Sequence, residues 1–173
     1  DHGWAAGYAE VGPHNASGGA KARFELHLRD QAPMEVLWRM PGPHNAANAT
    51  AAAYLACRAG MEPEAIPAAL AAFPGVARRF EIKYRSGGKA IIDDYAHHPT
   101  EVEGAIAAAR QTFPGQRITG VFQPHLYSRT QDFMEGFAQA LSALDNCILL
   151  PIYAARENPL PGVDAQGIGE KMV

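Results

Sequence analysis

Three clusters of ionisable side chains each follow directly after a short apolar run of the sequence. The clusters contain, in chain order, Asp93, Asp94, Tyr95, His97 and His98; then His125, Tyr127 and Arg129; then Tyr153, Arg156 and Glu157. Imidazole, carboxylate and guanidinium groups that meet at one place can bind an anionic substrate and stabilise a charged transition state. The carboxyl ends of buried parallel strands share one edge of a sheet, so we expect the three clusters to line one crevice.

Two other interpretations of these residues compete with an anion site. Zinc is one, because several side chains are possible ligands: Asp94, His97, His98 and His125. We expect no metal there, since adjacent histidines rarely face one ion and Arg129 would oppose a cation. A structural role is the other, in which the histidine pair caps the following helix and Arg129 lies on a solvated helix start.

A pair of carboxamides forms a separate candidate site. Asn45 and Asn48 lie three residues apart, at the start of an Ala-rich helix expected over residues 46–59, and therefore share one helical face. Two carboxamides on one face can read the donor and acceptor edge of a purine. Asn45 is equally suited to cap the helix, so the pair alone does not decide between the two roles.

The ionisable clusters depend on elements predicted for the second half of the chain. The pattern predicts strands at 80–84, 89–93, 118–122 and 147–150, and helices that begin at Pro99, near Ser128 and after Asp164. Ser128 and Gln131 have capping-box spacing, and Phe133, Phe137 and Leu141 form a buried stripe on the same helix. Alternation of strands and helices predicts a doubly wound α/β unit with a parallel sheet of buried strands.

A smaller α+β unit is predicted for the first half. Its expected elements are strands at 8–11, 21–28 and 34–39, a helix over 46–59, and a second helix from Glu62 or Pro63. The strands at 21–28 and 34–39 form an antiparallel pair. Gly60 ends the first helix, and residues 76–79 form a linker to the second unit.

Composition narrows the class of protein. The 173 residues are 47% hydrophobic and 19% charged, which predicts a folded core, and the net charge of -3 argues against a nucleic-acid surface. No apolar run reaches the roughly 20 residues that span a bilayer, and no secretory leader is visible. Cys57 and Cys147 lie far apart in apolar segments and are expected to be reduced core thiols, as in a cytoplasmic protein.

Four motifs recur in this order and spacing in the Mur ligases, which these residues resemble. They are residues 41–49 (PGPHNAANA), 78–80 (RRF), 93–101 (DDYAHHPTE) and 122–130 (FQPHLYSRT). The segment 153–162 also resembles the family members that join L-alanine to UDP-N-acetylmuramate in peptidoglycan synthesis. The resemblance implies that residues 1–78 end a central ATP-binding domain. Residues 79–173 would then begin a Rossmann-like carboxy-terminal domain that is incomplete here.

The same resemblance implies an ATP-dependent amide ligase that works through an acyl phosphate. ATP, UDP-N-acetylmuramate and L-alanine would be its substrates, and Mg²⁺ its cofactor, with magnesium ligands mainly outside this chain. The implied nucleotide contacts are His44, Asn45, Asn48, Arg79 and Asp94. The implied catalytic residues are Asp94, His97, His98 and Arg129, and the implied substrate-binding residues are Tyr95, His125, Arg129 and Arg156. The guanidinium of Arg129 and the amino-terminus of its helix should both attract the carboxylate of L-alanine.

The sequence departs from the family pattern at three positions. Many members have Arg, Gly and Arg where this chain has Pro43, Ala96 and Leu126. The last change removes one cation beside the expected amino-acid site. The chain also lacks the glycine-rich G-K-[ST] phosphate loop and the UDP-binding domain, so we expect a fragment without ligase activity of its own. A murein tripeptide ligase of peptidoglycan recycling and a non-catalytic nucleotide-binding module are the alternatives.

Overall fold

An antiparallel strand pair opens the part of the chain that the computed structural model describes, residues 22–28 and 31–173. Strands β1 (Ala22–Leu26) and β2 (Met34–Trp38) pair with Phe24 opposite Val36. Alternation along both strands buries Phe24, Val36 and Trp38, and the rings of Phe24 and Trp38 meet edge to face at 5.7 Å. The predicted strand pair is confirmed, whereas the strand expected at 8–11 lies outside the described residues.

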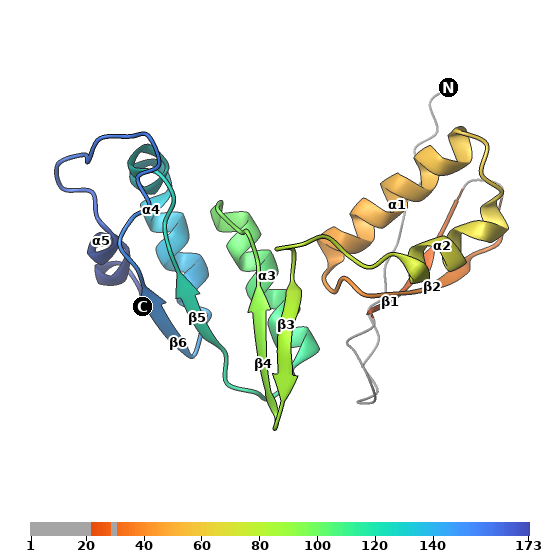
Figure 1. Cartoon of the computed structure of the whole chain (residues 1–173), viewed down its shortest axis with the longest axis horizontal. Helices are drawn as coiled ribbons and strands as arrows, with labels where there is room; N and C mark the ends of the chain where they lie inside the picture. The colour runs from red at the N-terminus through yellow and green to blue at the C-terminus, as the bar shows by residue number, and fades with distance from the viewer. Residues whose placement is uncertain (1–21, 29–30) are drawn as a thin grey trace. The chain divides into compact units, whose positions relative to one another are not determined.

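Helices pack on this strand pair and complete the first core. Helix α1 (Pro43–Arg58) begins at its proline and is followed by Gly60 in the left-handed region at a φ of 97°. The short turn η1 (Pro63–Ala65) leads into α2 (Ile66–Ala72). Buried Ala46, Ala49 and Ala53 form a narrow helical face against β1 and β2, and Ile66 joins the same cluster. Figure 1 shows α1 and α2 beside the two strands.

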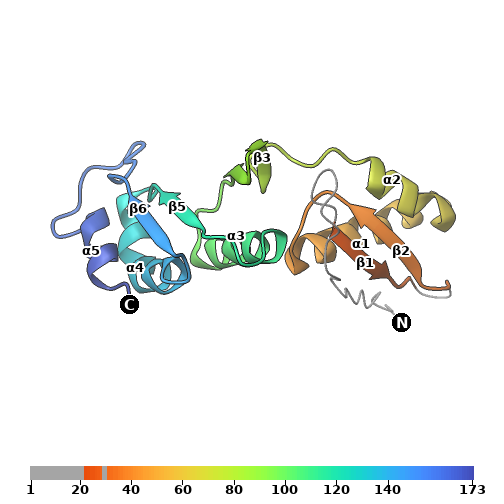
Figure 2. The same ribbon diagram turned by 90° about the horizontal axis from the view of Figure 1, so that it is seen from below.

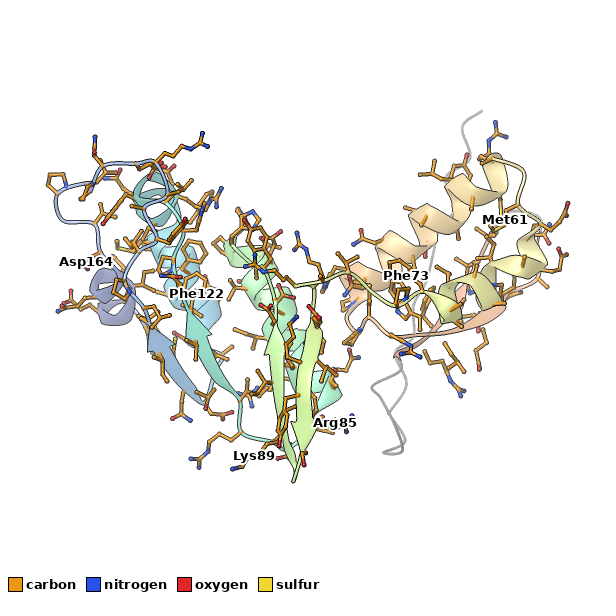
Figure 3. The ribbon with its side chains drawn as sticks, viewed as in Figure 1. Met61, Phe73, Arg85, Lys89, Phe122 and Asp164 are labelled. Atoms are coloured by element: carbon orange, nitrogen blue, oxygen red, sulfur yellow. The ribbon has the colours of Figure 1, made fainter. Side chains whose placement is uncertain are left out.

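A second hairpin follows the predicted linker. Strands β3 (Glu81–Ser86) and β4 (Lys89–Asp93) pair antiparallel across Gly87 and Gly88, which have φ values of 56° and 73°. Glycine tolerates this left-handed backbone without cost, which explains the tight turn. Lys89 and Arg85, labelled in Figure 3, lie at the turn end of the hairpin. The chain divides into two compact units, residues 1–94 and 95–173.

Helices and strands alternate in the second compact unit, residues 95–173, as the sequence predicted for that part of the chain. Its elements are α3 (Pro99–Thr112), β5 (Thr119–Phe122), α4 (Tyr127–Leu141), β6 (Asn146–Leu149) and α5 (Ala165–Glu170). Strands β5 and β6 are parallel, with Phe122 opposite Leu149. The sequence predicted three parallel strands, but β4 pairs with β3 through the tight turn, and only β5 and β6 are parallel among the described strands.

One face of the β5–β6 pair carries the second core. Phe122, labelled in Figure 3, packs its ring 5.2 Å from that of Phe137 on α4. Further core residues come from all three helices: Val102, Ile106, Ala138, Ala140, Leu141 and Ile168. The two views in Figures 1 and 2 show α4 alongside β5 and β6. Alternate residues Val121 and Ile148 are 64% and 52% exposed, so the prediction that these strands are buried on both faces is wrong for this structure.

Arg110 and Asp145 form an ion pair, called the clamp below, that connects the end of α3 to the segments that precede β5 and β6. Arg110 near the end of α3 donates hydrogen bonds to the Asp145 carboxylate at 2.8 Å and to the Ala143 carbonyl at 2.9 Å. The same carboxylate accepts the Ile118 N–H at 2.7 Å, just before β5. The Arg110 hydrogen bond and then the Ile118 N–H lower the pKa of Asp145. The clamp therefore fixes the amino ends of β5 and β6 relative to α3.

Candidate functional site

The structure brings the second and third ionisable clusters together. His125 and Tyr153, which follow β5 and β6, form a parallel bridge, and their rings stack at 5.5 Å. Tyr153 N–H donates to the Pro124 carbonyl at 2.8 Å, and Leu126 N–H donates to the Tyr153 carbonyl at 3.0 Å. The expected convergence at the carboxyl ends of the strands therefore holds for these two clusters.

Arg129 lies beside His125. Its Nη1 is 3.4 Å from His125 Nδ1, a long hydrogen bond in which the guanidinium donates and the imidazole nitrogen accepts. The contact joins a strand end to the first turn of α4, four residues later. His125 therefore has an aromatic ring on one face and a cation at its edge, and Arg129 remains a cation that can bind a carboxylate.

Glu157 caps the helix that carries Arg129. Its carboxylate accepts the Ser128 N–H at 3.0 Å and the Ser128 hydroxyl at 2.5 Å. The Ser128 hydroxyl and then its N–H lower the pKa of Glu157. The predicted capping box of Ser128 and Gln131 is wrong, because α4 begins at Tyr127 and its N-cap is Leu126, at a φ of 71°. The sequence pattern put Glu157 in the third cluster but indicated no role for it, because its partner, Ser128, lies 29 residues earlier in the chain.

The histidine pair of the first cluster is held by two different sets of contacts. His98 is the N-cap of α3, where its Nδ1 accepts the Thr100 N–H at 3.3 Å, and its ring meets Phe133 edge to face at 4.6 Å. The capping role that competed with a chemical one is thus confirmed for His98. Phe133 is 37% exposed at a non-helical position of α4, which contradicts its predicted place in the buried stripe.

His97 faces two acceptors. Its Nδ1 lies 2.9 Å from the Tyr95 carbonyl oxygen and 3.2 Å from the Glu101 carboxylate. The same carboxylate accepts a hydrogen bond from the backbone N–H of His97 at 2.9 Å. In the neutral tautomer that these contacts favour, Nδ1 donates to the two acceptors and Nε2 is the nitrogen that can accept a proton. The ring of Tyr95 lies 5.2 Å from that of His97 and is 45% exposed.

Asp94 orders the linker that holds Arg79. Its carboxylate accepts the Phe80 N–H at 2.8 Å, and Glu81 accepts the Arg78 N–H at 2.9 Å. Arg78 and Phe80 have left-handed φ values of 59° and 47°, which are costly for residues other than glycine. Arg79 thus lies between two strained residues whose N–H groups are bound by carboxylates, and its backbone position is defined.

The two carboxamides of α1 have different environments. Asn45 is only 6% exposed and donates from Nδ2 to the Pro41 carbonyl at 2.7 Å, whereas Asn48 is exposed, as is His44. The alternative that Asn45 caps the helix is wrong, because the N-cap is Gly42 and has no side-chain cap. The buried side chain of Asn45 therefore stabilises the loop before α1, and the side chains of Asn48 and His44 are the ones that a ligand could contact from solvent.

Within 22–28 and 31–173, no group of three or more His, Cys, Asp or Glu side chains is placed to hold a metal ion. Magnesium at a nucleotide site is usually held by one or two carboxylates together with phosphate oxygens and water, so it does not require a cluster of this kind. None of the helices in the described segments is long and apolar enough to cross a membrane.

Known proteins share both the sequence and the fold. The family described as Mur ligase, glutamate ligase domain, matches residues 78–173. A UDP-N-acetylmuramate–L-alanine ligase of Arthrobacter sp. (strain FB24) is 49% identical over 160 residues, which cover 86% of this chain and 34% of that protein. The chain thus spans about a third of the length of such relatives.

Two solved structures carry the comparison further. The UDP-N-acetylmuramate-alanine ligase of Thermotoga maritima superposes with a TM-score of 0.66 at 30% identity, over 78% of this chain and 30% of that one. A murein peptide ligase of Psychrobacter arcticus gives a TM-score of 0.54 at 23% identity, over 94% of this chain and 32% of that one. The second likeness is one of fold alone.

Proposed function

The chain belongs to the Mur ligase family, and on that premise we propose that it is part of an ATP-dependent ligase that joins L-alanine to UDP-N-acetylmuramate. The observation that carries the proposal is the 49% identity, over 86% of this chain, to a relative named for that reaction. The murein peptide ligase, at 23% identity, is the weaker candidate. The partly exposed stack of His125 and Tyr153 beside Arg129 supports a site for a small carboxylate-bearing substrate.

The reaction proceeds in two steps. The muramoyl carboxylate attacks the terminal phosphorus of ATP, which releases ADP and leaves an acyl phosphate. The amine of L-alanine then attacks the acyl carbon, the bond to the phosphate oxygen breaks, and inorganic phosphate leaves as the amide forms. Each amide formed therefore consumes one ATP, and the amine loses a proton.

This chain contributes the side chains that bind the amino acid and the one that accepts the proton lost by its amine. Arg129 binds the carboxylate of L-alanine, and His125 and Tyr153 form one wall of that pocket, with Arg156 on the same loop as a further cation. His97 accepts the proton that the amine loses, at the Nε2 nitrogen that its Nδ1 contacts leave basic. His98, the next residue, caps α3 and so fixes the start of the helix that follows His97.

The nucleotide is bound by the first half of the chain. Asn48 and His44 contact adenine from the exposed side of α1, and buried Asn45 holds the loop that orients them. Asp94, directly after β4, lies near the ribose, and Arg79 reaches the phosphates from the linker that Asp94 orders. The division into a central domain up to residue 78 and a carboxy-terminal domain from residue 79 takes support from the family match, which starts at residue 78. The enzyme acts in the cytoplasm, where its nucleotide substrates are made.

Omission of substrates tests this function. The complete ligase is incubated with ATP and UDP-N-acetylmuramate, and phosphate release is measured with L-alanine, with the tripeptide that a recycling ligase would use, or with neither. Release that requires L-alanine supports the proposal. Release that requires the tripeptide would instead identify a murein tripeptide ligase, and binding of ATP without turnover would leave a nucleotide-binding module. The 173-residue chain alone is the control and should release no phosphate above the blank.

A further inference from the structure

Among the hydrogen bonds that attach the loop between β6 and α5 to the start of α4 and to the residues just before it, three attachments hold Tyr153 and Glu157. The first two are backbone hydrogen bonds, from Tyr153 N–H to the Pro124 carbonyl and from Leu126 N–H to the Tyr153 carbonyl. The third is the pair of hydrogen bonds that the Glu157 carboxylate accepts from Ser128. Glu157 N–H also donates to the Ala154 carbonyl at 2.9 Å, which closes a turn directly after Tyr153. The carboxylate therefore anchors the segment that holds the Tyr153 ring.

The amino-terminus of α4 needs such an anchor. The first N–H groups of any helix lack partners within the helix, and a helix start attracts negative charge. The α4 N-cap, Leu126, has no polar side chain, and the first turn of α4 contains no acidic residue. Glu157 supplies both the acceptor and the charge from the distant loop. The anion at this helix start is thus a residue of the protein, and not a substrate.

We infer that Glu157 is a positioning residue of the amino-acid pocket, which caps α4 and so holds Arg129 and the Tyr153–His125 stack in one arrangement. The inference rests on the function proposed above and changes one part of it. The sequence predicted that Arg129 and the helix amino-terminus together attract the carboxylate of L-alanine, but the helix terminus already binds Glu157. Arg129 is left as the group that binds the substrate carboxylate, and its backbone follows directly on the capped Ser128.

Kinetics of the complete ligase test the role. Glu157→Gln keeps the size of the side chain but removes its charge, and the matched control Glu103→Gln makes the same change at an exposed position of α3. We expect Glu157→Gln to raise the KM for L-alanine by about tenfold or more, the effect of weakening a charge-assisted hydrogen bond, and the KM for ATP by less than about twofold. Ser128→Ala should give a similar rise, and the double variant little more than either single one. Equal effects of Glu157→Gln and Glu103→Gln, or an equal rise in both KM values, would overturn the inference.

A measurement on the 173-residue chain separates this inference from the proposed function. The amide resonance of Ser128 should shift as Glu157 is protonated, with a midpoint below the ordinary carboxyl value of 4.5, and Glu157→Gln should abolish the shift. If the Ser128 amide resonance does not shift when Glu157 is protonated, the capping role of Glu157 is refuted, even when the complete ligase uses L-alanine. If Ser128 reports Glu157 but the ligase does not use L-alanine, the proposed function fails, and with it the role of Glu157 in an amino-acid pocket.

Discussion

Gly136 lets α4 approach the start of α3, and its replacement by Ala gives a prediction with two opposing terms. A Cβ atom at Gly136 would lie 2.9 Å from Pro99 Cγ and 3.1 Å from Pro99 Cβ. The pyrrolidine ring is rigid and begins α3, so it cannot move aside as a flexible side chain would. The same contact lies next to His98, whose ring packs on Phe133, one turn before Gly136 on α4.

The magnitudes favour a loss of stability. Ala exceeds Gly in helix propensity by about 0.8–1.0 kcal/mol in a helix interior, which would stabilise the variant. Insertion of a methyl group into a packed contact costs about 1–3 kcal/mol. The sum predicts that Gly136→Ala lowers the free energy of unfolding by about 1 kcal/mol, and by up to about 2 kcal/mol.

Amide hydrogen exchange is the suitable assay, because neither Trp4 nor Trp38 lies in residues 95–173 and tryptophan fluorescence would not report on them. Protection of the α3 and α4 amides should fall in Gly136→Ala. Gly169→Ala is the control, since its Cβ would meet only Leu149 Cδ1 at 3.4 Å. Replacing Pro99 by Ala as well should reduce the loss. Higher protection in Gly136→Ala than in wild type would refute the close approach of α3 and α4.

Three further predictions concern other contacts. Asn45→Ala should lower the free energy of unfolding by about 1–2 kcal/mol, because a buried carbonyl loses its donor, and the fluorescence of buried Trp38 should follow this unfolding. Arg110 lowers the pKa of Asp145, so the clamp stabilises the fold above the ordinary carboxyl value of 3.8 and loses this contribution as pH falls through the lower folded pKa. Asp145→Asn should weaken that pH dependence in acid unfolding curves. Arg129→Lys should reduce kcat/KM for L-alanine by an amount equivalent to about 1.5–3 kcal/mol with little change in the KM for ATP, and an unchanged value would make Arg129 a surface charge.

Much of the architecture could be predicted because it depends on local patterns. Alternation predicted β1 and β2, and Gly87 and Gly88 predicted the tight turn between β3 and β4. The order of apolar runs predicted that the residues after β5 and β6 would meet, as His125 and Tyr153 do. These features follow from side-chain period and turn chemistry, which neighbouring residues determine.

The features that the sequence did not predict depend on distant partners or on the packing of whole elements. Ser128 and Gln131 fit a local cap, but the acceptor for the Ser128 N–H comes from Glu157 in another loop. One face of β5, which includes Val121, is exposed because the helices cover only the other face. An apolar run in the sequence does not indicate whether one face of a strand or both will be covered. Asn45 matched the residue type of a helix cap, yet its side chain turns inward to a carbonyl four residues before it.

Isotope transfer tests whether this chain belongs to a ligase that activates a carboxylate as an acyl phosphate. The complete ligase is given UDP-N-acetylmuramate labelled with oxygen-18 in its carboxylate, together with ATP and L-alanine, and the released phosphate is analysed by mass. Each phosphate should carry one labelled oxygen, because the bond broken in amide formation joins the acyl carbon to an oxygen of the original carboxylate. Amide formation accompanied by unlabelled phosphate would contradict the acyl-phosphate route, and with it the function proposed for this chain.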